Sequence, residues 1–386
     1  MKRKYWIGLA LALCIAGMLY CFFSREKDLQ DYIPAKSKMV ARLSVSAIQQ
    51  SENFSQLASP IGLPLNVSDI KSDAFVFITP NEYFGLAFDL QDTNSFLSNI
   101  PSKDVTEQDG LKWIWTKSGW LVTLSGKKLL ALGPGTAQER DRLRHTLRVM
   151  IDSPADEGFG HTAKANALKT DAPIAFVGST KVLPAPYGTL LRLALPEKSG
   201  EIVGAVTQTT GHTVISGSLW HEDFNFVAPQ KNAPSIPPSD YLLLGTIITD
   251  GSELLKRIRQ DASARMLLKA MDDTTSAAKR LEMMRGEIHF LVSDLDSAGN
   301  ALCHIEGTDV QGKAIAIGNA GRLSLETPPF PVAREHRATM VIQTGRLLAA
   351  PLPESIRGML RLALADCRQI IIQTEPQGAF QITFSE

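Results

Sequence analysis

Two histidines and two glutamates have the spacing that comes closest to a metal site. His289 follows Glu287 by two residues, and Glu306 follows His304 by two residues, in neighbouring segments of alternating character. In a β-hairpin, alternation places all four side chains on one face, whereas Cys303 points to the other face. Two imidazoles and a carboxylate could bind zinc. A solvated face with cross-strand His–Glu pairs explains the same pattern, so we predict no metal site here.

Three tryptophans form our candidate binding surface. Trp113, Trp115 and Trp120 flank a predicted turn at residues 117–119. Flat indole faces stack well on sugars and peptides, which makes these side chains a possible platform for either ligand. The alternation of Trp113 and Trp115 with other residue types is equally typical of one buried face of a strand. The sequence leaves both interpretations open.

The segment Gly133-Pro134-Gly135-Thr136 precedes a predicted helix over about residues 136–151. Backbone amides at such a junction can bind a phosphate. Thr136 and Glu139 have the spacing of a capping box, which favours an ordinary helix start. The predicted helix also carries several basic residues, which we interpret as a charged solvent face, with contact to anionic headgroups as the alternative; they are Arg140, Arg142, Arg144 and Arg148.

The chain lacks the linear motifs of several enzyme classes. It contains neither Gly-x-Ser-x-Gly nor His-Glu-x-x-His, so we predict that it is not an enzyme and requires no cofactor. Its 40 basic and 40 acidic residues give a formal net charge of zero, and a general nucleic-acid binder needs a positive surplus. Cys303 and Cys367 either pair in an oxidising compartment or remain buried thiols, the interpretation we favour.

The N-terminal segment predicts a location. Residues 5–23 carry no charge, and a helix of nineteen residues spans about 28 Å, close to the roughly 30 Å hydrocarbon core of a bilayer. Basic residues precede this span, so residues 1–4 are expected in the cytoplasm, residues 24–32 form a linker, and the bulk of the chain is periplasmic. We predict an uncleaved, single-pass signal anchor in the inner membrane. A lipoprotein attached through Cys21 is the alternative, although bulky Tyr20 precedes that cysteine.

The remaining sequence resembles two copies of one unit. The pentapeptide Leu-Arg-Leu-Ala-Leu occurs at residues 191–195 and again at 360–364, and each copy is followed by a hairpin pattern. We predict a first repeat over residues 33–227, with an insertion at about 92–170, and a second repeat over 239–386. Strands alternating with one or two helices indicate an α+β architecture.

A proline-rich linker over residues 228–238 joins the two predicted repeats. The complete prediction is therefore an α+β protein in which an N-terminal transmembrane helix precedes two tandem related domains of antiparallel β-sheet packed on helices. Within the second repeat, Glu375-Pro376-Gln377-Gly378 has the composition of a tight turn.

Three structural patterns together resemble a known family. These are Ile-Pro-Ala-Lys-Ser-Lys-Met-Val-Ala-Arg-Leu at residues 33–43, Gly-Glu-Ile-His-Phe at 286–290, and the paired terminal hairpins. They are similar to a bacterial envelope family catalogued only as a domain of unknown function. The resemblance covers most of residues 31–386 and implies an exported, membrane-attached protein without known catalytic residues.

Our leading functional prediction is an interaction or scaffolding protein with a partner in the envelope. The alternative is a ligand-binding domain for peptide, glycan or lipid, in a groove that the two copies form where they pack together. An open apolar cleft between the copies would favour the ligand-binding alternative. A hydrolase that acts on envelope polymers is the third and least favoured hypothesis.

Overall fold

The computed structural model describes most of the chain from residue 27 to residue 385. The described residues are 27–46, 62, 67–100, 105–183, 187–195, 200–209, 212–220, 241–261, 264–265, 274–295, 301–318, 336–349 and 367–385. The predicted anchor at 5–23, the predicted linker at 228–238 and the second pentapeptide at 360–364 lie outside the described residues.

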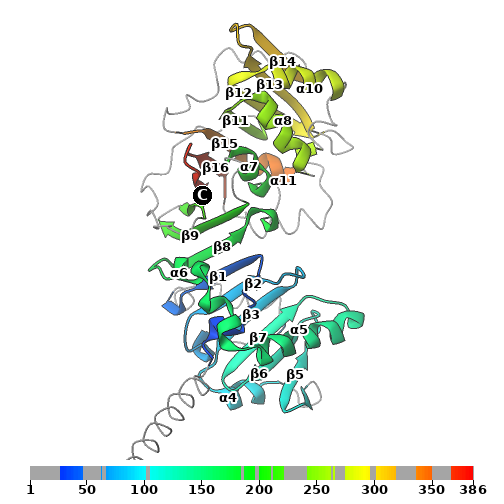
Figure 1. The fold of residues 1–386 in the computed structure, drawn as a ribbon, viewed down its shortest axis with the longest axis vertical. Coiled ribbons are helices and arrows are strands. Elements are labelled where there is room, and N and C mark those ends of the chain that lie inside the picture. The colour runs from blue at the N-terminus through cyan, green and yellow to red at the C-terminus, as the bar shows by residue number, and fades with distance from the viewer. Residues whose placement is uncertain are drawn as a thin grey trace, which may run out of the picture. The chain divides into compact units, whose positions relative to one another are not determined.

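The described residues form seventeen strands, and the pairings of these strands are antiparallel (Figure 1). The chain divides into two compact units. The first holds residues 27–37 and 62–165 of the described chain, and the second holds 38–46 and 166–385. This division cuts through the predicted first repeat at 33–227, whose boundaries stay a prediction about sequence relationship.

The first unit contains a sheet with the strand order β2-β3-β7-β6-β5-β4. Its strands are β2 (Ala74–Ile78), β3 (Phe84–Asp89), β4 (Val105–Gln108), β5 (Leu111–Trp115), β6 (Leu121–Ser125) and β7 (Lys128–Gly133). The helices of this part of the chain are α4 (Thr93–Ser98), α5 (Arg140–Asp152) and the short helices η1 (Leu29–Tyr32), η3 (Val67–Asp69), η5 (Ala137–Glu139), η6 (Ala155–Glu157) and η7 (Phe159–His161). Helix α6 (Ala163–Ala167) follows them.

The second unit contains eleven strands in the order β1-β8-β9-β10-β17-β16-β15-β11-β12-β13-β14. They are β1 (Met39–Leu43), β8 (Ile174–Ser179), β9 (Glu201–Thr209), β10 (His212–Leu219), β11 (Leu243–Ile248), β12 (Arg285–Leu295), β13 (Ala301–Thr308), β14 (Ala314–Gly318), β15 (Ala338–Gln343), β16 (Gln369–Thr374) and β17 (Ala379–Ser385). The helices are η8 (Thr180–Val182), α7 (Tyr187–Ala194), α8 (Gly251–Gln260), α10 (Thr274–Met283) and α11 (Thr344–Ala349).

The strand order of this unit is mirrored about the pairing of β10 with β17. On one side lie β9, β8 and β1, and on the other side lie β16, β15 and β11. In each half a helix, α7 or α11, follows the strand before the hairpin. Two copies of one segment would produce this order, so the topology supports the duplication, which itself stays a prediction.

Phenylalanine rings opposite glycines recur across the strand pairings. Gly245 pairs with Phe290, and a Cβ at Gly245 would lie 2.3 Å from Cζ of that ring. The same arrangement occurs at three other pairs, because only a glycine leaves room for an aromatic ring to lie over the neighbouring strand. They are Gly85 with Phe77, Gly204 with Phe176, and Gly217 with Phe380.

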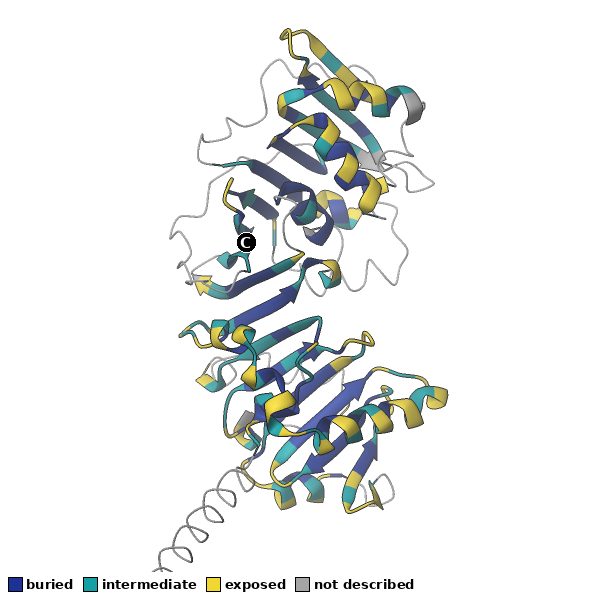
Figure 2. Ribbon diagram, viewed as in Figure 1, coloured by how far each residue is buried: buried dark blue, intermediate teal, exposed yellow. Residues whose placement is uncertain are grey.

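The core of the second unit lies between its sheet and its helices. Apolar residues of α7, α8 and α10 join those of the central strands in one buried cluster (Figure 2). Leu254 and Ile258 of α8 are one helical turn apart, so both side chains point toward the sheet.

The predicted turn at Glu375–Gly378 is confirmed, because Gly378 has a φ of 94° and its N–H donates to the Glu375 carbonyl at 3.0 Å.

The predicted fold class is wrong. The described structure is dominated by antiparallel strands with few helices, instead of the predicted α+β architecture. The predicted insertion at 92–170 supplies four strands of its own, β4 to β7. Among the described residues the longest helix, α5, has 13 residues, whereas a membrane span needs about 20. Within the ranges described above, we find no helix with the length and apolar character to cross a bilayer.

Candidate functional site

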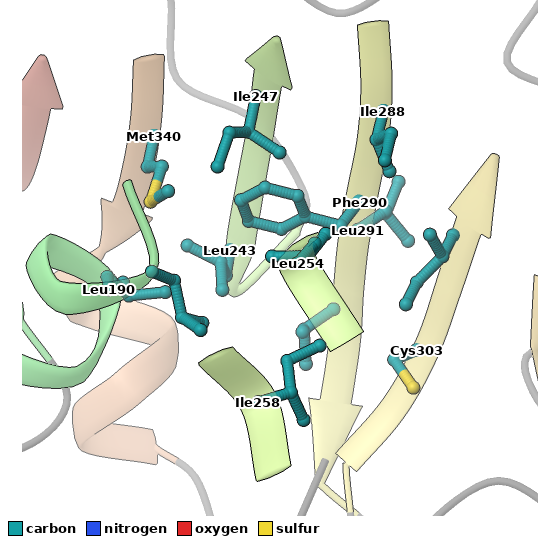
Figure 3. A pocket seen from close by; sticks show the side chains of 13 residues that line it. Leu190, Leu243, Ile247, Leu254, Ile258, Ile288, Phe290, Leu291, Cys303 and Met340 are labelled. Carbon is teal, nitrogen blue, oxygen red and sulfur yellow. The ribbon is translucent and has the colours of Figure 1, made fainter. Parts of the chain in front are cut away.

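An apolar pocket lies inside the second unit, between the sheet and two helices (Figure 3). Strands β11, β12, β13 and β15 form its floor, and α7 and α8 lie over them. All of the side chains that line it are hydrophobic or sulfur-containing. They are Leu190, Leu193, Leu243, Ile247, Leu254, Ile258, Ile288, Phe290, Leu291, Val292, Cys303, Ile305 and Met340.

The pairing of β11 with β12 determines which side chains form the floor of the pocket. Leu243 and Ile247 of β11 pair with Val292 and Ile288 of β12, so side chains two residues apart face the same side. Between them, Gly245 pairs with Phe290, whose ring occupies the space that a side chain on β11 would fill. The floor is therefore a continuous apolar surface that depends on one missing Cβ.

Two segments that are distant in sequence form the rest of the wall. Leu190 and Leu193 are three residues apart on α7, within the predicted first repeat. Leu254 and Ile258 lie on α8, within the predicted second repeat. Residues of both predicted copies thus line the pocket, while the division of the chain into two copies stays a prediction.

The lining of the pocket determines which contacts it can make, and this lining is apolar throughout. The volume of this partly open pocket is about 70 Å³, several times the roughly 10–15 Å³ that one water molecule requires. A buried water also needs hydrogen-bond partners, and this lining supplies no strong ones. Burial raises the pKa of the Cys303 thiol, which keeps its proton at neutral pH. The pocket can therefore accept an apolar molecule and offers it no charged nucleophile.

Beside this pocket lies a group of three charged side chains. Arg257 of α8 contacts the carboxylate of Glu253, one turn earlier on the same helix. Arg337, just before β15, places Nη2 at 3.7 Å from the other carboxylate oxygen of Glu253. Partial burial raises the pKa of Glu253, but Arg257, Arg337 and a hydrogen bond from Thr249 outweigh that effect and lower it.

The structure places the three predicted tryptophans in the first unit. Trp113 is 1% exposed, Trp120 is 8% exposed, and Trp115 is half-buried. The guanidinium groups of Arg144 and Arg140 lie over the rings of Trp113 and Trp115, at 5.8 and 5.6 Å from the ring centroids. Helix α5 therefore contacts two of the indoles, and the binding surface proposed for them stays a prediction.

In the hairpin of β12 and β13, the histidines and Cys303 lie on the faces that the sequence predicts. His289 pairs with Glu306 and Leu291 pairs with His304, so both imidazoles share a face, and Cys303 lies on the other face with Val292. The His–Glu pairs form within each strand instead of across strands, at 3.8 Å for His289 with Glu287 and 3.5 Å for His304 with Glu306. No three potential metal ligands gather among the described residues.

The predicted capping box is confirmed. The backbone N–H of Thr136 donates to Oε2 of Glu139 at 2.9 Å, and its hydroxyl donates to the same oxygen at 3.0 Å. These hydrogen bonds lower the pKa of Glu139, and the bond from the backbone N–H has the larger effect.

The structure holds Cys303 and Cys367 as thiols.

Sequence reasoning missed the pocket itself. Leu254 and Ile258 were visible as helically spaced apolar residues, which is also the pattern of an ordinary core. The one distinctive signal is Gly245, a glycine inside an apolar run, which marks a place where a side chain or ligand approaches the backbone.

No protein-family model matches the chain, and no curated protein matches it. Similar solved structures include crystal forms of TP0453. Form I has a TM-score of 0.35 at 12% identity and covers 52% of this chain and 82% of that chain. Form III has a TM-score of 0.33 at 12% identity, with 52% and 83% covered. The resemblance to an envelope family of unknown function stays a prediction.

Proposed function

We propose that the second unit is a non-catalytic binding module for an apolar molecule. The observation that carries this proposal is a partly open pocket of about 70 Å³ that is lined by apolar side chains of α7, α8 and the sheet. Removing apolar surface from water contributes roughly 25 cal/mol per Å², so an apolar ligand in this cavity is stabilised without any polar contact. Of the ligand classes predicted from the sequence, lipid fits this lining best.

The pocket favours the predicted ligand-binding alternative over the predicted scaffolding role. An open apolar cleft between the two predicted copies was the feature expected to favour ligand binding, and Leu193 and Ile258 lie in different predicted copies. The interaction role needs a partner surface that the pocket does not supply. It stays a prediction, as does the envelope hydrolase.

A neutral fluorescent probe, N-phenyl-1-naphthylamine, tests the proposal on the full chain. We expect saturable binding to the wild type, with fluorescence enhancement. Ile258→Trp places a larger side chain in the cavity and should weaken binding at least about tenfold, the equivalent of roughly 1.4 kcal/mol. Ile248→Trp makes the same exchange at a residue of β11 that is 36% exposed and should retain binding.

Thermal unfolding of each variant shows whether it folds. If Ile258→Trp does not fold, stabilisation of the wild type by the probe replaces the variant comparison, because a ligand that binds only the native state raises the melting temperature. A wild type that neither saturates nor is stabilised refutes the proposal. Equal binding by both tryptophan variants places the probe elsewhere and refutes it too.

A further inference from the structure

We propose that the ligand of this pocket is an amphiphile whose anionic head is bound by Arg257 and Arg337. This inference rests on the proposed apolar binding function and specifies the chemical class of its ligand. Three observations on the charged group of Glu253, Arg257 and Arg337 support it. These are the position of the group beside the pocket, its excess of positive charge, and the arginine N–H groups that make no hydrogen bond among the described residues.

The charged group borders the pocket through its immediate neighbours. Arg257 lies between the pocket-lining residues Leu254 and Ile258 on α8, and its Nη1 donates to the carbonyl of Leu193, another lining residue, at 2.8 Å. Arg337 is bonded to β11 through its carbonyl, which accepts from the N–H of Ile248 at 2.7 Å, next to a lining residue.

The group has more positive than negative charge. Two guanidinium groups share the single carboxylate of Glu253, and their side chains are only 4% and 15% exposed for Arg257 and Arg337. Burial, followed by repulsion from Arg257, lowers the pKa of Arg337. Two ion pairs lie nearby, at 2.6 Å for Arg192 with Asp261 and 3.5 Å for Arg285 with Asp250. Within the part of the chain that the structure describes, the surplus positive charge of this group therefore belongs to Arg257 and Arg337, which share Glu253.

Both arginines also keep a donor unused. Within the described part of the chain, Nε of Arg257 and Nε of Arg337 are buried and make no hydrogen bond. A buried unpaired donor is costly, and an anion would satisfy it while offsetting the surplus charge. The planar fork of arginine matches carboxylate and phosphate oxygens, which gives the ligand class as a chain with a carboxylate or phosphate head.

Calorimetry on the full protein tests this inference with ligands that have the same alkyl chain and different head groups. Dodecanoic acid and its methyl ester share a chain and differ in head charge, and dodecyl phosphate distinguishes a phosphate from a carboxylate preference. We expect the wild type to bind the acid or the phosphate about tenfold more tightly than the ester, the effect of a charge-assisted hydrogen bond. Arg337→Gln should abolish this preference.

Arg259→Gln is the matched control, because Arg259 is an exposed arginine on the same helix. It should preserve the preference. If the ester binds as well as both anions in the wild type, the anionic-head inference is overturned while the apolar binding function survives. If none of the three probes binds, the proposed function fails as well. The wild-type comparison decides the question even if Arg337→Gln does not fold.

Discussion

Adding one methyl group at Gly245 probes the packing that creates the pocket. In Gly245→Ala, the new Cβ would lie 2.3 Å from Cζ and 2.6 Å from Cε2 of Phe290. Contacts this short do not occur, so the ring must move into the cavity or the two strands must separate. Overpacking of this kind typically costs about 1–3 kcal/mol of unfolding free energy.

A double-mutant cycle isolates this clash from other effects. Phe290→Leu removes the ring atoms that the new methyl group would meet, so Gly245→Ala should cost less than about 0.5 kcal/mol in that background. The expected coupling energy is about 1–2 kcal/mol. Chemical denaturation of the four proteins measures it, with Gly345→Ala as a control at an exposed glycine that has no atom within 4 Å of a built Cβ. An equal cost in both backgrounds would refute the ring-over-glycine explanation.

Two further predictions concern the turn after β16 and the buried thiol. Gly378→Ala forces an alanine to a φ of 94° and brings its Cβ to 2.6 Å from Leu219 Cδ1, so we expect a loss of about 1–3 kcal/mol by chemical denaturation, whereas an unchanged midpoint would contradict the turn geometry. Because burial raises the pKa of Cys303, the unfolded chain loses its thiol proton first, and stability falls as the pH rises above about 8.5. Cys303→Ala should flatten this alkaline decline, and identical slopes for the two proteins would argue against a desolvated thiol.

Local features of the structure could be predicted because their causes are local. Thr136 and Glu139 are three residues apart, and the turn at Gly378 requires a residue that tolerates positive φ. The shared face of His289 and His304 follows from alternation within one hairpin. In each case the interacting groups are near one another in the chain.

The fold class and the pocket depend on contacts between distant residues. β10 pairs with β17 through Ile215 and Ile382, and no local pattern specifies that partner. Buried strands such as β7 are nearly continuous apolar runs, which periodicity alone does not separate from helix. The pocket additionally requires α7 and α8 to meet over β11, an arrangement that becomes visible only in three dimensions.

Titration of the full chain with the uncharged naphthylamine probe tests the central claim most directly. We predict a single saturable site that is retained in Ile248→Trp and lost in Ile258→Trp. Fluorescence that rises without saturation, or that is the same for both variants, would show that the space between α8 and the sheet is ordinary core and not a binding site.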